Sequence, residues 1–193
     1  MFILLAGMML MGGCARYART VNTLYEPSAT VRGGNGDVYI VIPESQKTQS
    51  SEMKWVLGKV MDHDNNQIDE VLSSRSPSEI IQDAFGQEFK VGGYTVIPTA
   101  KRPEAEQRVI NITKTEIDLQ QTSDLADIKA KCRVLVGFDV YKNGQLIKRL
   151  QYEASSSKFD IKDRDLLARN VLQDTIQSLM LKAIPDLNSL FNQ

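Results

Sequence analysis

The sequence contains little of what an enzyme active site or a metal centre requires. Its 193 residues include one histidine, His63, and two cysteines, Cys14 and Cys132. Catalytic triads and zinc sites need histidine or cysteine held together with fixed partners. A single histidine in the polar stretch 62–66 supplies no such set. We therefore predict that the protein is not an enzyme and binds no metal or cofactor.

The chain also lacks an excess of charge of either sign and a long apolar run. The chain has 23 basic and 24 acidic residues and a net charge of -1. Nucleic-acid-binding domains present a basic face, so we expect no nucleic-acid partner. No apolar run reaches the roughly 20 residues that span a bilayer. A hydrophobic content of 42% is typical of a globular protein.

The first residues form a short apolar segment, 2–13, that leads into Met11-Gly12-Gly13-Cys14. Its length is that of a signal-peptide core. Small residues before a cysteine resemble the lipobox of bacterial lipoproteins. That resemblance implies a signal peptide at 1–13, lipidation of Cys14 and a membrane anchor. Ala15 rather than Asp follows the cysteine, which by resemblance to enterobacterial sorting signals implies the outer membrane, facing the periplasm.

The stretch 14–36 has little periodicity and carries Gly33-Gly34-Asn35-Gly36. We predict a lipidated, flexible tether that spans a few tens of Å and lifts the domain off the membrane. A single periplasmic domain, 37–193, is expected to follow. Because Cys14 is assigned to lipid, Cys132 has no partner for a disulfide bond.

The clearest element is a helix that begins after Ser76. Ser76 suits the N-cap position, Pro77 the first helical position and Glu79 the third position of a capping box. Apolar residues follow at helical spacing, and Gly92-Gly93 supply the positive φ that ends a helix.

Prolines are predicted to end three elements. Strands at 38–42 and 94–97 stop at Pro43 and Pro98. A final helix opens at Asp163, and Pro185 forbids its straight continuation, so that 186–191 form a short separate turn or helix. Further strands are expected at 55–60 and 109–119.

The longest strand signal, 130–141, predicts a hairpin that turns at Lys142-Asn143-Gly144 and returns along 145–156. The strand alternates apolar and polar residues, which places Cys132 and Val134 on the core face. A two-residue loop would place Val134 opposite Glu153 on the returning strand. A three-residue loop with Gly144 as the bulge residue places it opposite Tyr152.

Because a slip of one residue exchanges the two faces of a strand, we predict the three-residue loop. That loop also places Arg133 opposite Glu153 on the solvent side of the hairpin. Together the elements predict an α+β fold: a two-layer sandwich in which two main helices lie on one face of a mainly antiparallel sheet.

Other groups of polar residues have simpler interpretations than catalysis. Asp62, Asp64 and Asn66 begin like a calcium loop, but the required glycine and bidentate glutamate are missing, which favours an exposed turn. Cys132 is expected to be buried and unreactive.

An acidic cluster and two aromatic residues complete the candidates. The cluster near Glu153 is interpreted as helix capping; it comprises Asp160, Asp163 and Asp165. The aromatic residues Trp55 and Tyr39 are expected to pack in the core.

The stretch 76–96, in which a capped helix ends at Gly92-Gly93-Tyr94 and passes into a strand, resembles the YajG-like bacterial lipoproteins. A related layout occurs in auxiliary lipoproteins of ABC-type and lipid-transport systems. The resemblance implies a small periplasmic domain held at the outer membrane without known catalysis, and it supplies no functional residues.

The function predicted from the sequence is that of a non-enzymatic, lipid-anchored envelope protein. We expect it to bind a protein partner or to assist an envelope assembly or transport system. The alternative is a module that binds a small ligand, lipid or glycan, in a groove between helices and sheet.

Overall fold

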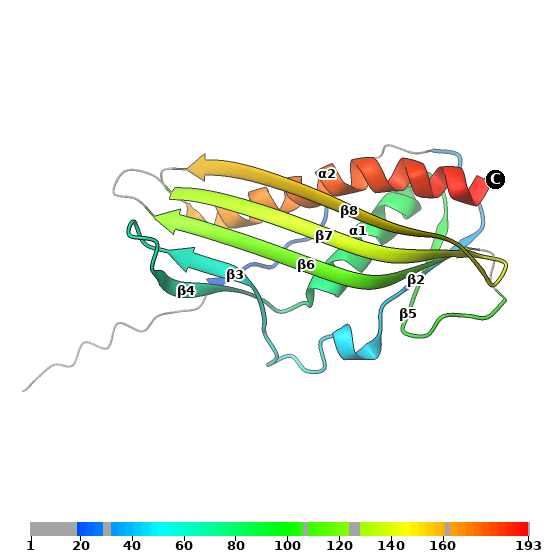
Figure 1. Cartoon of the computed structure of the whole chain (residues 1–193), viewed down its shortest axis with the longest axis horizontal. Coiled ribbons are helices and arrows are strands. Elements are labelled where there is room, and N and C mark those ends of the chain that lie inside the picture. The colour runs from blue at the N-terminus through cyan, green and yellow to red at the C-terminus, as the bar shows by residue number, and fades with distance from the viewer. Residues whose placement is uncertain (1–18, 29–31, 106–107, 124–127, 161–162, 193) are drawn as a thin grey trace, which may run out of the picture.

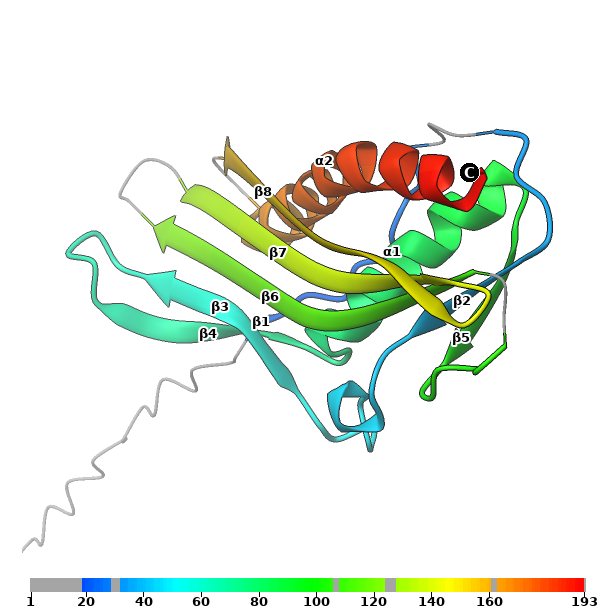
Figure 2. The ribbon, with the colours of Figure 1, turned by 45° about the vertical axis from the view of Figure 1, so that its right-hand side comes forward.

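The computed structural model describes residues 19–28, 32–105, 108–123, 128–160 and 163–192. It confirms the α+β class: an eight-stranded sheet curls around two helices. Figure 2 shows this curl most clearly, with the longest strands wrapping past the helices. No helix among the described residues combines the length and apolar character that crossing a bilayer requires.

The sheet is built on one long strand, β6 (Val109–Ser123). One edge of β6 pairs antiparallel with β7 (Ile128–Lys142), which pairs antiparallel with β8 (Gln145–Asp160). The other edge is shared by two parallel partners, β2 (Asp37–Val41) near its start and β3 (Trp55–Met61) near its end.

Three shorter strands extend the two branches. β4 (Gln67–Ser73) is antiparallel to β3, β5 (Thr95–Thr99) is parallel to β2, and β1 (Arg19–Thr20) is parallel to β4. Four of the seven pairings within the described ranges are parallel, so the sheet is mixed. The expected antiparallel pattern holds for β3–β4 and for the long strands β6, β7 and β8.

Both helices pack against the inner side of the curl (Figure 1). α2 (Arg164–Asn192) runs along β7 and β8, whereas α1 (Pro77–Gly92) contacts β6, β2 and β5. Phe85 of α1 meets Phe138 of β7 edge-to-face, with ring centroids 5.4 Å apart. Side chains therefore fill the space between helices and sheet at this point.

The helix predicted from its caps, α1, is confirmed in detail. The Ser76 side chain accepts a hydrogen bond from the Glu79 amide, and the Glu79 carboxylate accepts one from the Ser76 amide. Gly93 ends the helix with a φ of 102°. These signals are local in sequence, which is why they could be read without tertiary information.

The predicted hairpin loop is wrong, although the predicted faces are right. The loop has two residues, Asn143 and Gly144, both at positive φ, and Lys142 pairs with Gln145. A bulge in β8 then shifts the register by one, so that Val134 lies opposite Ala154. The extra residue of the bulge restores the alternation that a two-residue loop alone would have reversed.

Two of the proline predictions are also wrong. Pro98 lies within β5 rather than after it, which an edge strand permits because one side of its backbone needs no partner. α2 continues through Pro185 to Asn192. Pro185 itself is exposed, while Leu187 and Phe191 beyond it are fully buried, so packing of the last turns maintains the helix.

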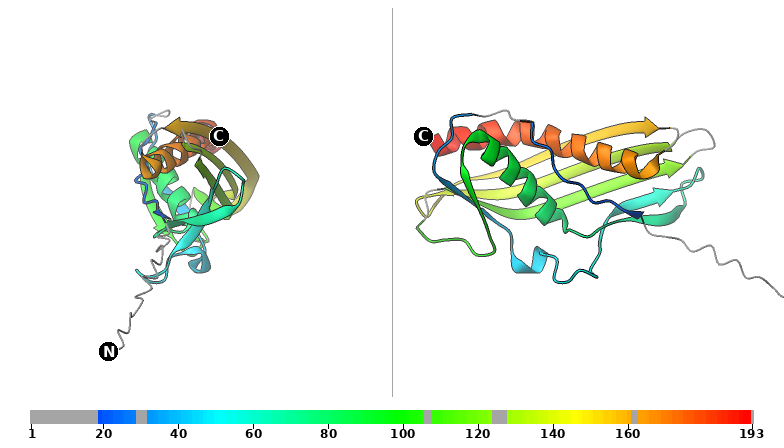
Figure 3. Two further views of the ribbon diagram at one scale, coloured as in Figure 1. Left: turned by 90° about the vertical axis from the view of Figure 1, so that its left-hand side faces the viewer. Right: turned by 180° about the vertical axis from the view of Figure 1, so that it is seen from behind.

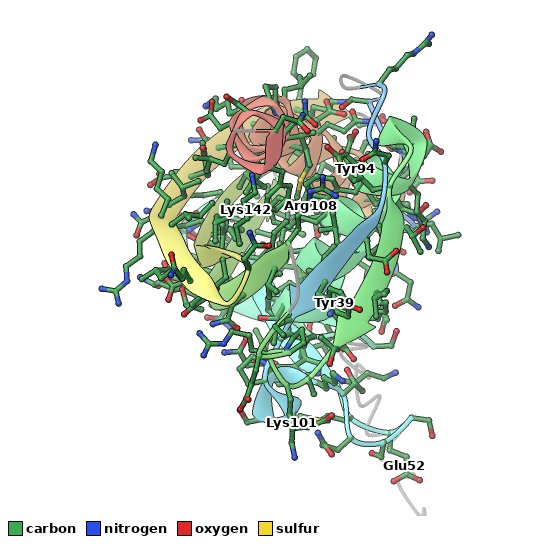
Figure 4. All side chains as sticks on the ribbon, turned by 90° about the vertical axis from the view of Figure 1, so that its right-hand side faces the viewer. Tyr39, Glu52, Tyr94, Lys101, Arg108 and Lys142 are labelled. Carbon is green, nitrogen blue, oxygen red and sulfur yellow. The ribbon has the colours of Figure 1, made fainter. Side chains whose placement is uncertain are left out.

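The sheet end that carries the β7–β8 turn is closed by polar contacts (Figure 4). Tyr94 donates a hydrogen bond to Asn188 of α2 (2.6 Å), and the Arg108 guanidinium lies over the Tyr94 ring. Lys142 donates to the Phe191 carbonyl near the end of α2 (3.2 Å). The C-terminal turn of α2 is thereby tied to the residue before β5 and to β7.

At Gly58 the backbone of β3 lies close against the backbone of β6. A Cβ atom there would overlap the Leu119 carbonyl oxygen, so we expect Gly58→Ala to destabilise the fold by about 3 kcal/mol. Gly86→Ala is the matched control, because its Cβ would meet only Val96 at 3.6 Å and would favour the helix by up to about 1 kcal/mol. Urea unfolding of both variants measures the difference. Equal stabilities would contradict the close β3–β6 contact.

Candidate functional site: the N-terminal strap and its buried glutamate

Residues 19–28 pack along the helices on the side opposite the sheet (Figure 3, right). We call residues 19–28 the strap. Its first two residues form β1, and the Val21 amide then donates to the Leu72 carbonyl (2.7 Å). The strap alternates buried Val21, Thr23 and Tyr25 with exposed residues. The expected flexible tether over 14–36 is therefore wrong for this part of the chain, which belongs to the folded domain.

A single carboxylate oxygen holds the end of the strap. Oε1 of Glu88, on α1, accepts hydrogen bonds from the Tyr25 hydroxyl (2.6 Å), the Ser28 amide (2.7 Å) and the Ser28 hydroxyl (2.7 Å). Glu88 is only 2% exposed. Three donors satisfy this oxygen, as a buried polar group requires.

The neighbouring oxygen, Glu88 Oε2, is buried without a hydrogen-bond partner among the described residues. Desolvation, together with the hydrogen bond to Glu88, raises the pKa of Tyr25 far above its usual value. The Tyr25 hydroxyl therefore stays protonated and remains a donor to Glu88 across the physiological pH range.

The second helix, α2, binds the backbone of the strap. The side-chain amides of Gln173 and Gln177, one turn apart on α2, both donate to the Glu26 carbonyl (3.0 and 2.8 Å). The strap is thus joined to β4, α1 and α2. These contacts fix residues 19–28 to the rest of the domain.

Glu88 was not among the residues singled out from the sequence, although a signal for it exists. It lies seven residues after Ile81 and three after Phe85, and therefore on the buried face of the helix. A charge on that face implies a buried partner. The partners, Tyr25 and Ser28, could not be identified, because about 60 residues separate them from Glu88.

The predicted lipidation site, Cys14, lies outside the described residues. Cys132 is buried in β7, as predicted, and is 1% exposed. Burial raises the pKa of its thiol to about 12. A nucleophilic role would need the opposite shift.

The other polar candidates do not come together. His63 lies in the exposed β3–β4 turn, where Asp62 accepts the Asp64 and Asn66 amides as an ordinary turn residue does. Asp163 accepts the Leu166 amide at the start of α2, as helix capping predicts. Glu153 lies seven residues from Asp160 along β8, about 23 Å away, and pairs with Arg133 instead.

Trp55 and Tyr39 were expected in the core, but both are only partly buried. The Trp55 indole donates to the Thr48 hydroxyl (3.0 Å) in the loop before β3. Trp55 is the first residue of β3, so this contact lies at the end of the strand.

The outer face of the long strands carries a shallow polar hollow of about 370 Å³. Charged and hydroxyl side chains from three neighbouring strands line it, among them Asp118 of β6, Lys131 and Arg133 of β7, and Ser155 and Ser157 of β8. Alternating charges and hydroxyl groups suit a polar partner surface better than an apolar ligand.

No protein-family model matches the chain, and no curated protein matches it. Solved structures with a similar layout include a Xanthomonas campestris protein of the DUF330 family (8% identity, 87% of this chain and 92% of that one, TM-score 0.44). Another is the rare lipoprotein B of Shewanella oneidensis, with 10% identity, coverage of 69% of this chain and 94% of that one, and a TM-score of 0.39. A third is a minor lipoprotein of Acinetobacter baumannii, with 10% identity, coverage of 78% of this chain and 91% of that one, and a TM-score of 0.37. Similarity at this level carries no argument about function, and the YajG-like resemblance stays a prediction.

Removing the Glu88 carboxylate tests the strap. In Glu88→Ala the buried Tyr25 hydroxyl loses its acceptor, and we expect a loss of about 2–3 kcal/mol in the free energy of unfolding. Backbone amides of the strap should also exchange faster with solvent. Glu26→Ala, whose side chain is exposed, is the control and should change neither quantity. Unchanged exchange in Glu88→Ala would show that the carboxylate does not hold the strap.

The state of Cys132 can be checked by its reactivity. With a thiol pKa of about 12 and 1% exposure, it should not react with a thiol reagent at pH 8 in the folded protein. In urea the same thiol should react at once. Rapid modification of Cys132 in the native protein, located by peptide mass spectrometry, would contradict its burial.

Proposed function

We propose that this protein is a non-enzymatic lipoprotein of the bacterial envelope, anchored through Cys14 at the outer membrane and facing the periplasm. The observation that carries the proposal is the strap. It begins five residues after Cys14 and is bonded to a sheet edge and both helices. A lipid attached at Cys14 would therefore hold the whole domain beside a bilayer.

The domain serves, in this proposal, as a binding module for a protein partner of an envelope assembly or transport system. The polar hollow on the outer face of β6, β7 and β8 supports a surface role. The groove between helices and sheet, which the alternative small-ligand function needs, is occupied by packed aromatic rings at Phe85 and Phe138. That packing favours a protein partner over a buried lipid or glycan.

Replacing the acylated cysteine tests the anchor directly. Cys14→Ser cannot form the thioether to a diacylglycerol, and each lost buried CH₂ removes about 0.8 kcal/mol of membrane affinity. We expect the variant to move from the membrane pellet to the soluble fraction. Ser155→Ala, on the outer face, is the control and should stay in the pellet. Mass spectrometry of the wild-type protein should show the acyl chains, and an unacylated wild-type chain would refute the proposal.

A further inference from the structure

We infer that the protein lies against the bilayer on one particular side, the surface formed by the strap and the outward stripes of α1 and α2. We call this surface the helix–strap face. The inference rests on the proposed lipidation of Cys14, and it adds which surface meets lipid and which stays free. The opposite, outer face of the sheet is then turned toward the aqueous compartment.

The length of chain before the strap limits how far the domain can stand from the membrane. Arg19 is the first residue of β1, and five residue steps lead back to Cys14. At most about 3.6 Å per residue, these steps span no more than about 18 Å. The long strands from Leu119 to Val109 extend about 33 Å from the level of Arg19. The end of the domain at the level of Arg19 can therefore reach lipid, and the surface chemistry decides which of its faces does so.

The helix–strap face presents apolar side chains to solvent. Leu24, in the middle of the strap, is 85% exposed although residues on both sides of it are buried. Leu166 and Leu181 are 44% and 49% exposed. They follow helical spacing with Gln173 and Gln177, the two residues that bind the strap, and so share its side of α2.

The first helix adds a fourth apolar side chain to the same face. Val91, 46% exposed, lies three residues after Glu88 and therefore beside the strap contact on α1. The other exposed large hydrophobic residues among those described lie toward the ends of strands, at Val56, Leu146, Ile147 and Phe159. Four of the eight exposed large apolar side chains among the described residues thus lie on the helix–strap face.

The outer face of the sheet has the opposite character. Lys114 with Glu116 and Arg133 with Glu153 form exposed ion pairs across it. Bringing such a charged face against lipid would desolvate these ions without compensation. The helix–strap face also carries exposed charges, such as Glu26, Lys90 and Arg169. Unlike the outer face, it adds exposed apolar side chains that can enter the boundary between headgroups and acyl chains at a gain. The chemistry of the two faces therefore favours the helix–strap face as the lipid-facing one.

Fluorescence quenching by lipid tests this orientation in the full-length, lipidated protein. The two label sites are Glu26→Cys on the strap and Ser155→Cys on the outer face, both exposed. Native Cys132 is buried and Cys14 is acylated, so the introduced thiol is the reactive one. Each labelled protein is reconstituted into vesicles of phosphatidylethanolamine and phosphatidylglycerol that contain a lipid with a nitroxide on its headgroup.

We expect a several-fold greater loss of fluorescence at residue 26 than at residue 155. Leu24→Ser in the Glu26→Cys protein should reduce the loss at residue 26, whereas the matched change Leu146→Ser, far from the strap, should not. Equal quenching at both sites, or stronger quenching at residue 155, would overturn the inference while leaving the anchor intact.

Flotation of the vesicles separates this result from the proposed function. Protein that floats with the vesicles and shows stronger quenching at residue 26 supports both conclusions. Protein that floats with the reverse pattern retains the anchor and refutes the orientation. Protein that does not float refutes the lipid anchor, and the orientation with it. Cys14→Ser serves as the unanchored reference and should show neither flotation nor quenching.

Discussion

The fold depends on how the two hydrogen-bonding edges of β6 are divided among its neighbouring strands. Its 15 residues pair with β7 along one edge, while the other edge is divided between β2 and β3. No single short strand could cover that edge, and an unpaired edge of this length would be open to other chains. Two branches result, one formed by β2 and β5 and the other by β3 and β4. The helix α1 follows β4 and precedes β5 in the chain, so it connects the two branches and packs across the place where they meet.

This division explains where the strap can bind. One branch ends in β4, whose free edge accepts β1 as a parallel strand. From there the chain crosses the helices, where Glu88 and the two glutamines hold it. The strap therefore covers apolar surface that two helices on a curled sheet leave exposed. It also brings the start of the domain to the side of the molecule that carries Leu24.

The consequence for function is a domain with two unlike faces. The helix–strap face carries half of the exposed large apolar side chains among the described residues and includes the strap that follows the proposed anchor, whereas the outer face of the long strands carries ion pairs and hydroxyl groups. In the proposed arrangement the protein needs no enclosed ligand cavity, because the outer face of the sheet would bind the partner while the helices lie near the bilayer. The packed contact of Phe85 with Phe138 agrees with that division of roles.

The sequence by itself determined the elements whose signals are local. The capping box at Ser76 and Glu79 and the Gly93 helix end depend on groups within a few residues of one another, and the alternation in β7 marks its own buried face. Tertiary structure alone decided the rest: the missed strands β1 and β4, the bulge in β8, the helix that continues past Pro185 and the partners of Glu88. Each of these depends on a backbone or side-chain group supplied from far along the chain, and no local pattern encodes which distant group satisfies a buried donor or acceptor.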